Sequence, residues 1–126
     1  MGGSAKTVLV VDDDDALRNV CRINLELDGY RVLEAGSIAA AGRTLAEEHV
    51  DAMLLDLHLR DGDGRDLLRS LGDSRPPVAL FTGSEAIGPE LTALAEGVLA
   101  KPFALDALSE TVGRLTSGGA GIDSPR

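Results

Sequence analysis

Five short runs of apolar residues recur along the chain, and most of them are continuous rather than alternating with polar residues. Such runs are typical of strands that are buried on both faces, as in a parallel sheet. The second and fifth runs are the weakest signals, because one is more polar and the other is very short. The predicted strands are residues 7–11, 30–35, 52–57, 77–82 and 98–100.

The intervals between these runs carry apolar residues at helical spacing, which predicts a helix after each strand. Ser37 is placed as the N-cap of the second helix, and Gly29 and Gly72 lie where the first and third helices should end. The fourth helix is expected to be short, because Gly97 follows it closely. The helical stripes lie within residues 17–25, 38–45, 67–71, 91–95 and 105–115.

Strand and helix alternate about five times, which predicts an α/β fold, namely a doubly wound five-stranded parallel sheet with five helices. Parallel crossover connections are right-handed, so helices are expected on both faces of the sheet. In such folds the functional residues lie beyond the carboxyl ends of the strands. The residues that follow each apolar run are therefore the candidates for chemistry.

The length of 126 residues suits one domain, and 44% hydrophobic with 26% charged residues is an ordinary globular balance. We predict an N-terminal tail at residues 1–6, a folded domain at 7–116, and a flexible C-terminal tail or linker start at 117–126. Cys21 is the only cysteine, so no intramolecular disulfide can form, and its place in an apolar stripe predicts a buried side chain.

The net charge of −9 argues against direct binding to nucleic acid or to an anionic membrane. No stretch approaches the roughly 18 apolar residues that a membrane span needs, and no signal-peptide pattern is present. We therefore expect a cytoplasmic protein that meets cations or basic surfaces.

Polar groups lie at the ends of four of the predicted strands or directly after them. Residues 12–15 are four aspartates, Asp56 lies near the end of an apolar run, Thr82 ends the fourth run and Lys101 follows the fifth. Parallel strands would gather these groups at one edge, where crowded carboxylates call for a cation such as Mg²⁺. An ionised Asp56 can act as an oxygen nucleophile toward phosphorus, with Lys101 and Thr82 contacting phosphoryl oxygens. For the aspartates taken alone, a solvated helix-capping loop is as good an explanation as a metal site.

The segments VVDDDDALR, LLDLHLRDGDGRDLL, LFTGS and AKPF together resemble the receiver (phosphoacceptor) domain of two-component response regulators. The resemblance covers roughly residues 7–115 and implies a flavodoxin-like fold with strand order 2-1-3-4-5. By position, it implies that Asp56 is the phosphoacceptor, which becomes a 4-aspartylphosphate. Asp12 and Asp13 match the acidic pair, with Asp13 binding Mg²⁺ directly and Asp12 acting largely through water. The metal ligands would be Asp12, Asp13, Asp56 and the backbone carbonyl of His58.

The same resemblance assigns the other catalytic residues beside Asp56. Thr82 matches the switch hydroxyl, and Lys101 matches the lysine that pairs with the phosphoryl group. Pro102 lies where the family often has a cis Lys–Pro bond, and Gly64 matches the glycine that opens the third helix. Asp15 is interpreted as the N-cap of the first helix.

These matches imply a signalling phosphoacceptor of the phosphorelay type rather than a turnover enzyme. Mg²⁺-dependent transfer of a phosphoryl group from a sensor histidine kinase, or from a histidine phosphotransfer protein, would switch an output surface. Slow autodephosphorylation would reset it. The expected downstream partner is an effector domain or protein, with a homodimer formed on phosphorylation as a further option.

Three positions depart from the family pattern. Arg60 stands where proline is common, which is expected to loosen the loop after Asp56. Val98 occupies the place where many members carry a tyrosine or phenylalanine, so aromatic–threonine coupling is not expected here. The side chain of His58 either matters little beyond its carbonyl or shapes water access and dephosphorylation.

Two alternatives belong to other classes of protein. In a haloacid-dehalogenase-type phosphatase, Asp12 would be the nucleophile and Asp56 incidental. That interpretation lacks an acidic metal motif after Lys101 and room for a cap domain. The other alternative is a binding module that no longer accepts phosphate, although all key residues are present.

Overall fold

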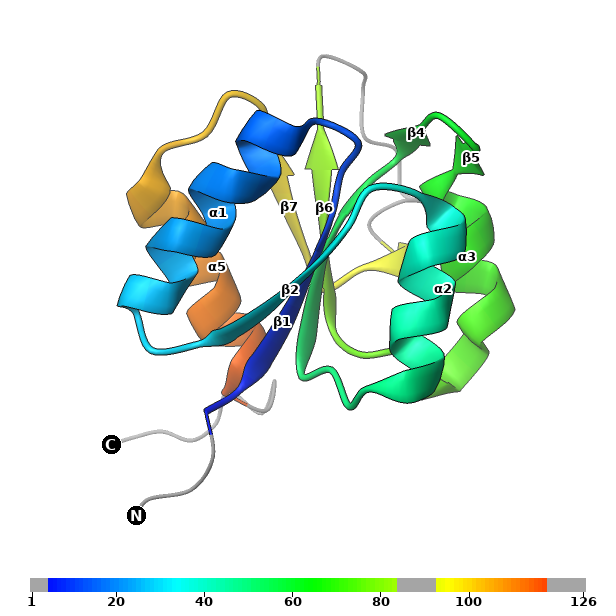
Figure 1. Ribbon diagram of the computed structural model, residues 1–126, viewed down its shortest axis with the longest axis horizontal. Helices are drawn as coiled ribbons and strands as arrows, with labels where there is room; N and C mark the ends of the chain where they lie inside the picture. The colour runs from blue at the N-terminus through cyan, green and yellow to red at the C-terminus, as the bar shows by residue number, and fades with distance from the viewer. Residues whose placement is uncertain (1–4, 84–92, 118–126) are drawn as a thin grey trace.

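The computed structural model describes residues 5–83 and 93–117, which form an α/β fold around a five-stranded sheet (Figure 1). All neighbouring strands in this sheet are parallel, and their order is β2-β1-β3-β6-β7. The order and the strand positions confirm the predicted 2-1-3-4-5 arrangement. The strands are β1 (Thr7–Val11), β2 (Arg31–Ala35), β3 (Ala52–Asp56), β6 (Val78–Thr82) and β7 (Gly97–Ala100).

Helices cover both faces of the sheet, as the crossover rule requires (Figure 1). On one face lie α1 (Asp15–Leu27) and α5 (Leu105–Thr116), and on the other lie α2 (Ile38–Glu47) and α3 (Gly64–Leu71), which a short 3-10 turn follows at Gly72–Ser74. The helix predicted within residues 91–95 falls largely outside the described part of the chain.

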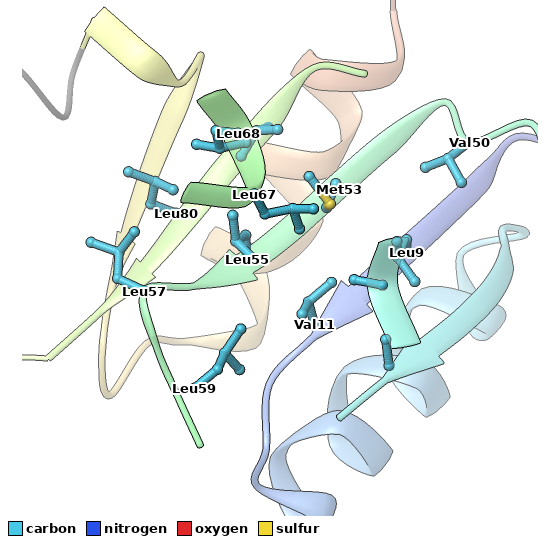
Figure 2. Close-up of a cluster of buried hydrophobic side chains, with 13 residues drawn as sticks. Leu9, Val11, Val50, Met53, Leu55, Leu57, Leu59, Leu67, Leu68 and Leu80 are labelled. Atoms are coloured by element: carbon cyan, nitrogen blue, oxygen red, sulfur yellow. The ribbon is translucent and has the colours of Figure 1, made fainter. Parts of the chain in front are cut away.

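The central strands are fully buried because their alternate side chains enter two separate cores. Leu9 and Val11 of β1 pack with α2 and α3 residues on one face (Figure 2). Val8 and Val10 pack on the other face against α1 and α5, where Cys21 is also buried as predicted. Burial on both sides explains why these strands are continuous apolar runs.

The N-cap of the first helix lies one residue earlier in the chain than predicted. Asp14 has an extended backbone, and its carboxylate accepts hydrogen bonds from the N–H groups of Ala16 (3.0 Å) and Leu17 (3.2 Å). Asp15 is already helical, and its carboxylate pairs with Arg18 instead. The prediction of Asp15 as N-cap was therefore wrong, because the cap is the residue that still has non-helical dihedral angles.

Other predicted helix ends are confirmed. Ser37 caps α2 by accepting a hydrogen bond from the N–H of Ala40 (3.0 Å). Gly29 and Gly72 follow α1 and α3 with positive φ angles of 98° and 59°, which glycine adopts without strain.

A small antiparallel hairpin between β3 and α3 was not predicted. It consists of β4 (His58–Leu59) and β5 (Gly62–Asp63). The carboxylate of Asp61, at its tip, accepts hydrogen bonds from the N–H groups of Ile38 (2.9 Å) and Ala39 (3.1 Å). The loop after Asp56, which Arg60 is expected to loosen, is thus tied to the first turn of α2.

The last helix ends at the edge of the sheet where the strands begin. Thr116, its final residue, has its hydroxyl 3.3 Å from that of Tyr30, which directly precedes β2. Within residues 5–83 and 93–117, no helix has the length and apolar character of a membrane span. The cytoplasmic location stays a prediction.

Candidate functional site

Three strands deliver charged residues to the same edge of the sheet. Asp12 follows β1, Asp56 ends β3 and Lys101 follows β7, so all three lie at carboxyl ends. Nζ of Lys101 lies 2.8 Å from Oδ2 of Asp12 and 3.3 Å from Oδ2 of Asp56. One ammonium group therefore joins two buried carboxylates, which are 1% and 7% exposed.

Asp13 completes a cluster of three carboxylates. Asp12, Asp13 and Asp56 each offer one oxygen, and these oxygens all lie within 4.8 Å of one another. Asp13 is only half-buried, so the cluster opens to solvent on its side. Oxygen donors from one or two carboxylates, with water in the other positions, are the ligands that Mg²⁺ takes in proteins. The donor set therefore fits a hard divalent cation.

The two buried carboxylates are oriented by the backbone as well as by the lysine. Oδ1 of Asp12 accepts a hydrogen bond from the N–H of Asp14 (2.9 Å), and Oδ1 of Asp56 accepts one from the N–H of His58 (3.0 Å). In each case the other oxygen, Oδ2, accepts from Lys101. Both carboxylates are thus fixed before any ligand arrives.

The electrostatics of the cluster raise two pKa values. Burial raises the pKa of Asp12, and the charge of Asp56 adds to this, while the hydrogen bond from Lys101 opposes it. For Lys101, burial lowers the pKa, but the hydrogen bond to Asp12 and the charges of Asp12 and Asp56 together outweigh it. The pKa of Lys101 therefore lies above its ordinary value, and the amine stays protonated at neutral pH.

Lys101 is held by its aromatic surroundings. Its ammonium group lies 5.7 Å from the centroid of the Phe81 ring, and that ring stacks on Phe103 at 5.1 Å. The Lys101–Pro102 peptide bond is cis, as the family resemblance implied. Val98, in the position of the family's aromatic residue, is half-buried and pairs with Leu80 across β6 and β7.

Gly64 is needed where α3 begins beside Asp56. A Cβ atom at this position would lie 2.6 Å from the backbone oxygen of Asp56 and 3.2 Å from Cγ of Leu55. The glycine that the resemblance placed at the start of the third helix is thus required by a close backbone approach.

Sequence reasoning missed a supporting role for Arg18. Its Nη1 donates a 2.6 Å hydrogen bond to the backbone oxygen of Asp12, and its Nε lies 3.2 Å from Oε1 of Glu34 on β2. The available signal was its position on the first turns of a helix that starts at the acidic pair. A basic residue there can reach back to the preceding loop.

Two predicted site residues are placed only in part. The backbone of Thr82 ends β6 beside Ala100, but its side chain is outside what the structure describes. His58 is exposed at the start of β4, directly beyond the cluster. The roles predicted for both remain predictions, as do those of the clustered residues.

A doubly wound parallel sheet with an acidic cluster and a lysine at its carboxyl edge is the arrangement of a receiver-type fold. The chain belongs to the response regulator receiver domain family, whose model matches residues 8–113. It is therefore a receiver domain of two-component systems.

Relatives and solved structures agree with this assignment. The chain is 36% identical over 105 residues to the KDP operon transcriptional regulatory protein KdpE of Escherichia coli, covering 80% of the chain and 47% of KdpE. It is 35% identical over 127 residues to the response regulator MprA of Mycobacterium sp. strain KMS, covering 94% and 55%. The chain thus spans about half the length of these relatives.

The fold matches solved receiver structures closely. A CheY-like receiver domain from Methanospirillum hungatei superposes with a TM-score of 0.83 at 24% identity, covering 95% of this chain and all of the other. The chemotaxis response regulator CheY4 of Vibrio cholerae gives a TM-score of 0.79 at 25% identity, covering 89% and 99%.

Proposed function

We propose that this domain accepts a phosphoryl group on Asp56 from a phosphohistidine, carried by a sensor histidine kinase or a histidine phosphotransfer protein. The observation that carries the proposal is the gathering of Asp12, Asp13 and Asp56 around one point, with Lys101 in contact with Asp56. A carboxylate at a strand end, beside a protonated amine and a site for a divalent cation, suits attack on phosphorus.

In the proposed transfer, one carboxylate oxygen of Asp56 attacks phosphorus in line with the departing histidine nitrogen. The P–O bond forms as the P–N bond breaks and its electron pair stays on the departing nitrogen. An imidazole whose other nitrogen carries a proton therefore leaves as the neutral ring. The N–H of His58 and the ammonium of Lys101 hold the Asp56 carboxylate in one orientation, which lowers the cost of alignment. The ammonium group of Lys101 then pairs with the negatively charged phosphoryl oxygens.

The proposed Mg²⁺ ligands are Asp13, Asp56, Asp12 largely through water, and the backbone carbonyl of His58. When bound, Mg²⁺ neutralises the negative charge that builds up on the phosphoryl oxygens. Asp12 contributes by holding Lys101 at 2.8 Å, so the amine stays over the site before and after transfer. Arg18 holds the Asp12 backbone in place.

A groove beside the cluster is suited to the phosphodonor protein. It has a volume of about 380 Å³ and runs from Asp14 and Lys101 to an apolar lining of Leu17, Val20 and Phe103. Val20 and the neighbouring Ile23 on α1 are 45% and 47% exposed, which is high for such side chains. A partner seated on this apolar strip would present its phosphohistidine next to Lys101.

After transfer, the acyl phosphate adds charge near Thr82, whose hydroxyl is proposed to move toward it and to shift an inactive–active equilibrium. Val98 has no ring to follow that movement, so the output surface reports phosphorylation without a swinging aromatic residue. A downstream effector domain or protein reads that surface. A homodimer of the phosphorylated domain is a further form of this output. Water later attacks phosphorus, releasing inorganic phosphate and restoring the Asp56 carboxylate.

The test is labelling with a small phosphodonor such as acetyl phosphate, with and without Mg²⁺, followed by mass spectrometry of the peptides. We expect Mg²⁺-dependent addition of one phosphoryl group on Asp56 and none on Asp56→Asn. A modified Asp12 would point to the phosphatase-type chemistry instead. No change on adding Mg²⁺ with beryllofluoride would favour a module that does not accept phosphate.

A further inference from the structure

The hairpin after Asp56 carries an arginine to the rim of the acidic cluster. Arg60 and Asp61 form the connection between β4 and β5, in which Leu59 pairs with Gly62. Nε of Arg60 lies 3.9 Å from Oδ2 of Asp13. Arg60 therefore adds a second basic side chain to the cluster, while Lys101 contacts Asp12 and Asp56.

The backbone that carries Arg60 is fixed, although its side chain is not buried. Both oxygens of Asp61 accept hydrogen bonds from the first N–H groups of α2, at 2.9 Å and 3.1 Å. Gly62 has a φ of 150°, and a Cβ there would lie 3.0 Å from Cδ1 of Ile38, so the turn packs closely on α2. The Arg60 side chain is 84% exposed, so it can leave Asp13 without losing packing.

The two basic residues divide the three carboxylates between them. Lys101 pairs with Asp12 and Asp56, which are nearly inaccessible. Arg60 pairs with Asp13, the carboxylate through which the cluster opens to solvent. A divalent cation that enters the cluster and binds Asp13 directly meets the guanidinium of Arg60 at the same carboxylate.

We propose that Arg60 competes with the divalent cation for Asp13, so that it weakens metal binding and is released when the ion binds. This inference rests on the proposed metal site. An exposed pair of opposite charges contributes little, so the competition should weaken metal affinity by about two- to fivefold. Because the pair is exposed, salt should screen it, and the effect should disappear at high ionic strength.

The test is calorimetric titration of the metal-free protein with MgCl₂, which measures the dissociation constant without any phosphoryl transfer. It compares wild type with Arg60→Gln, Arg60→Lys and Arg69→Gln. Arg69 is the matched control, because it forms an exposed pair with Asp66 on α3 and its removal changes the net charge equally. Each protein is titrated at an ionic strength of about 0.01 M, where the Debye length is about 30 Å, and at about 1 M, where it is about 3 Å.

At low ionic strength we expect Arg60→Gln to bind Mg²⁺ about two- to fivefold more tightly than wild type, and Arg60→Lys to bind like wild type. At high ionic strength all four proteins should bind alike. Equal affinities of wild type and Arg60→Gln at low ionic strength would overturn this inference alone, as would equal tightening by Arg69→Gln. No Mg²⁺ binding by any of the proteins would overturn the metal site itself and the inference with it.

Discussion

Lys101 and Asp12 form an ion pair of 2.8 Å, although 89 positions separate them in the chain. The pair joins the carboxyl end of the last strand to that of the first, across the intervening β3 and β6. It also holds a positive charge against a cluster of carboxylates that would otherwise repel one another. The acidic edge is therefore completed only when the whole sheet has formed.

Replacing Lys101 by methionine should destabilise the metal-free protein. Asp12 is 1% exposed and would lose the ion pair that offsets the burial of its carboxylate, which should cost about 1–3 kcal/mol. Urea unfolding at neutral pH measures the loss. Lys6→Met is the matched control, because Lys6 is the other lysine of the chain and is exposed. Equal stability of the two variants would contradict the structural role of the ion pair.

Asp12→Asn should have the opposite effect at neutral pH. The pKa of Asp12 lies above its ordinary value of 3.8, chiefly because the carboxylate is buried. Folding therefore favours the protonated form, and stability is lost as the pH rises through the raised pKa. Asparagine cannot ionise, so the metal-free variant should be more stable than wild type at about pH 7 and lose this advantage toward about pH 3. Urea unfolding across this range is the measurement.

The pKa of Asp51 is shifted in the direction opposite to that of Asp12. Burial would raise its pKa, but hydrogen bonds from the N–H of Thr7 (2.7 Å) and from His49 outweigh burial and lower it. The stabilisation that a lowered pKa provides is present at pH values above the ordinary pKa of the carboxyl group. It is lost as the pH falls through the lowered pKa. Asp51→Asn should therefore cost about 1 kcal/mol at neutral pH, and the same titration checks it. A gain in stability would contradict the assignment.

Removal and return of Mg²⁺ should change thermal stability. At a concentration of about 100 times the dissociation constant, Mg²⁺ should stabilise the chelator-treated protein by about 2.7 kcal/mol. Asp13→Asn should lose most of this gain, because Asp13 is the proposed direct ligand. Asp15→Asn should keep it, because Asp15 belongs to the same aspartate run but is 89% exposed and pairs with Arg18. Loss of the gain in both variants would indicate a general charge effect rather than a site.

Gly64→Ala should destabilise the protein and displace Asp56. The added Cβ would meet the Asp56 backbone oxygen at 2.6 Å, and relief of this overlap should cost about 1–3 kcal/mol. Gly113→Ala in α5 meets nothing within 4 Å and should instead add up to about 1 kcal/mol. Unfolding midpoints of the two variants, compared with wild type, test both signs. If Gly64→Ala is neutral, the close approach is relieved more easily than the structure implies.

The sheet and the gathering of the charged residues could be predicted because few features determine them. Continuous apolar runs identify strands that are buried on both faces. Parallel strands then place Asp12, Asp56 and Lys101 at one edge of the sheet, independently of the conformation of the loops. The predicted strand at residues 52–57 ends at Asp56 in the structure, one residue earlier. That difference leaves the phosphoacceptor candidate at the strand end.

The details that were missed depend on backbone angles and on contacts between distant segments. Asp14 and Asp15 are chemically identical, so only their dihedral angles decide which one caps α1. The two-residue strands β4 and β5 are too short to show periodicity. The contact of Arg60 with Asp13 depends on that hairpin. The hydrogen bonds between Asp61 and α2 join residues more than 20 positions apart. Neither contact therefore produces a local pattern in the sequence.

The end of α5 beside Tyr30 has a practical consequence. This helix ends beside the start of β2, whereas Asp56 lies at the carboxyl end of β3, at the other edge of the sheet. A biosensor surface or fluorescent reporter attached beyond α5 therefore starts at the edge of the sheet opposite to Asp56. Immobilisation through that end leaves the edge that carries Asp56 uncovered, and measurements of phosphodonor binding should be set up in this orientation.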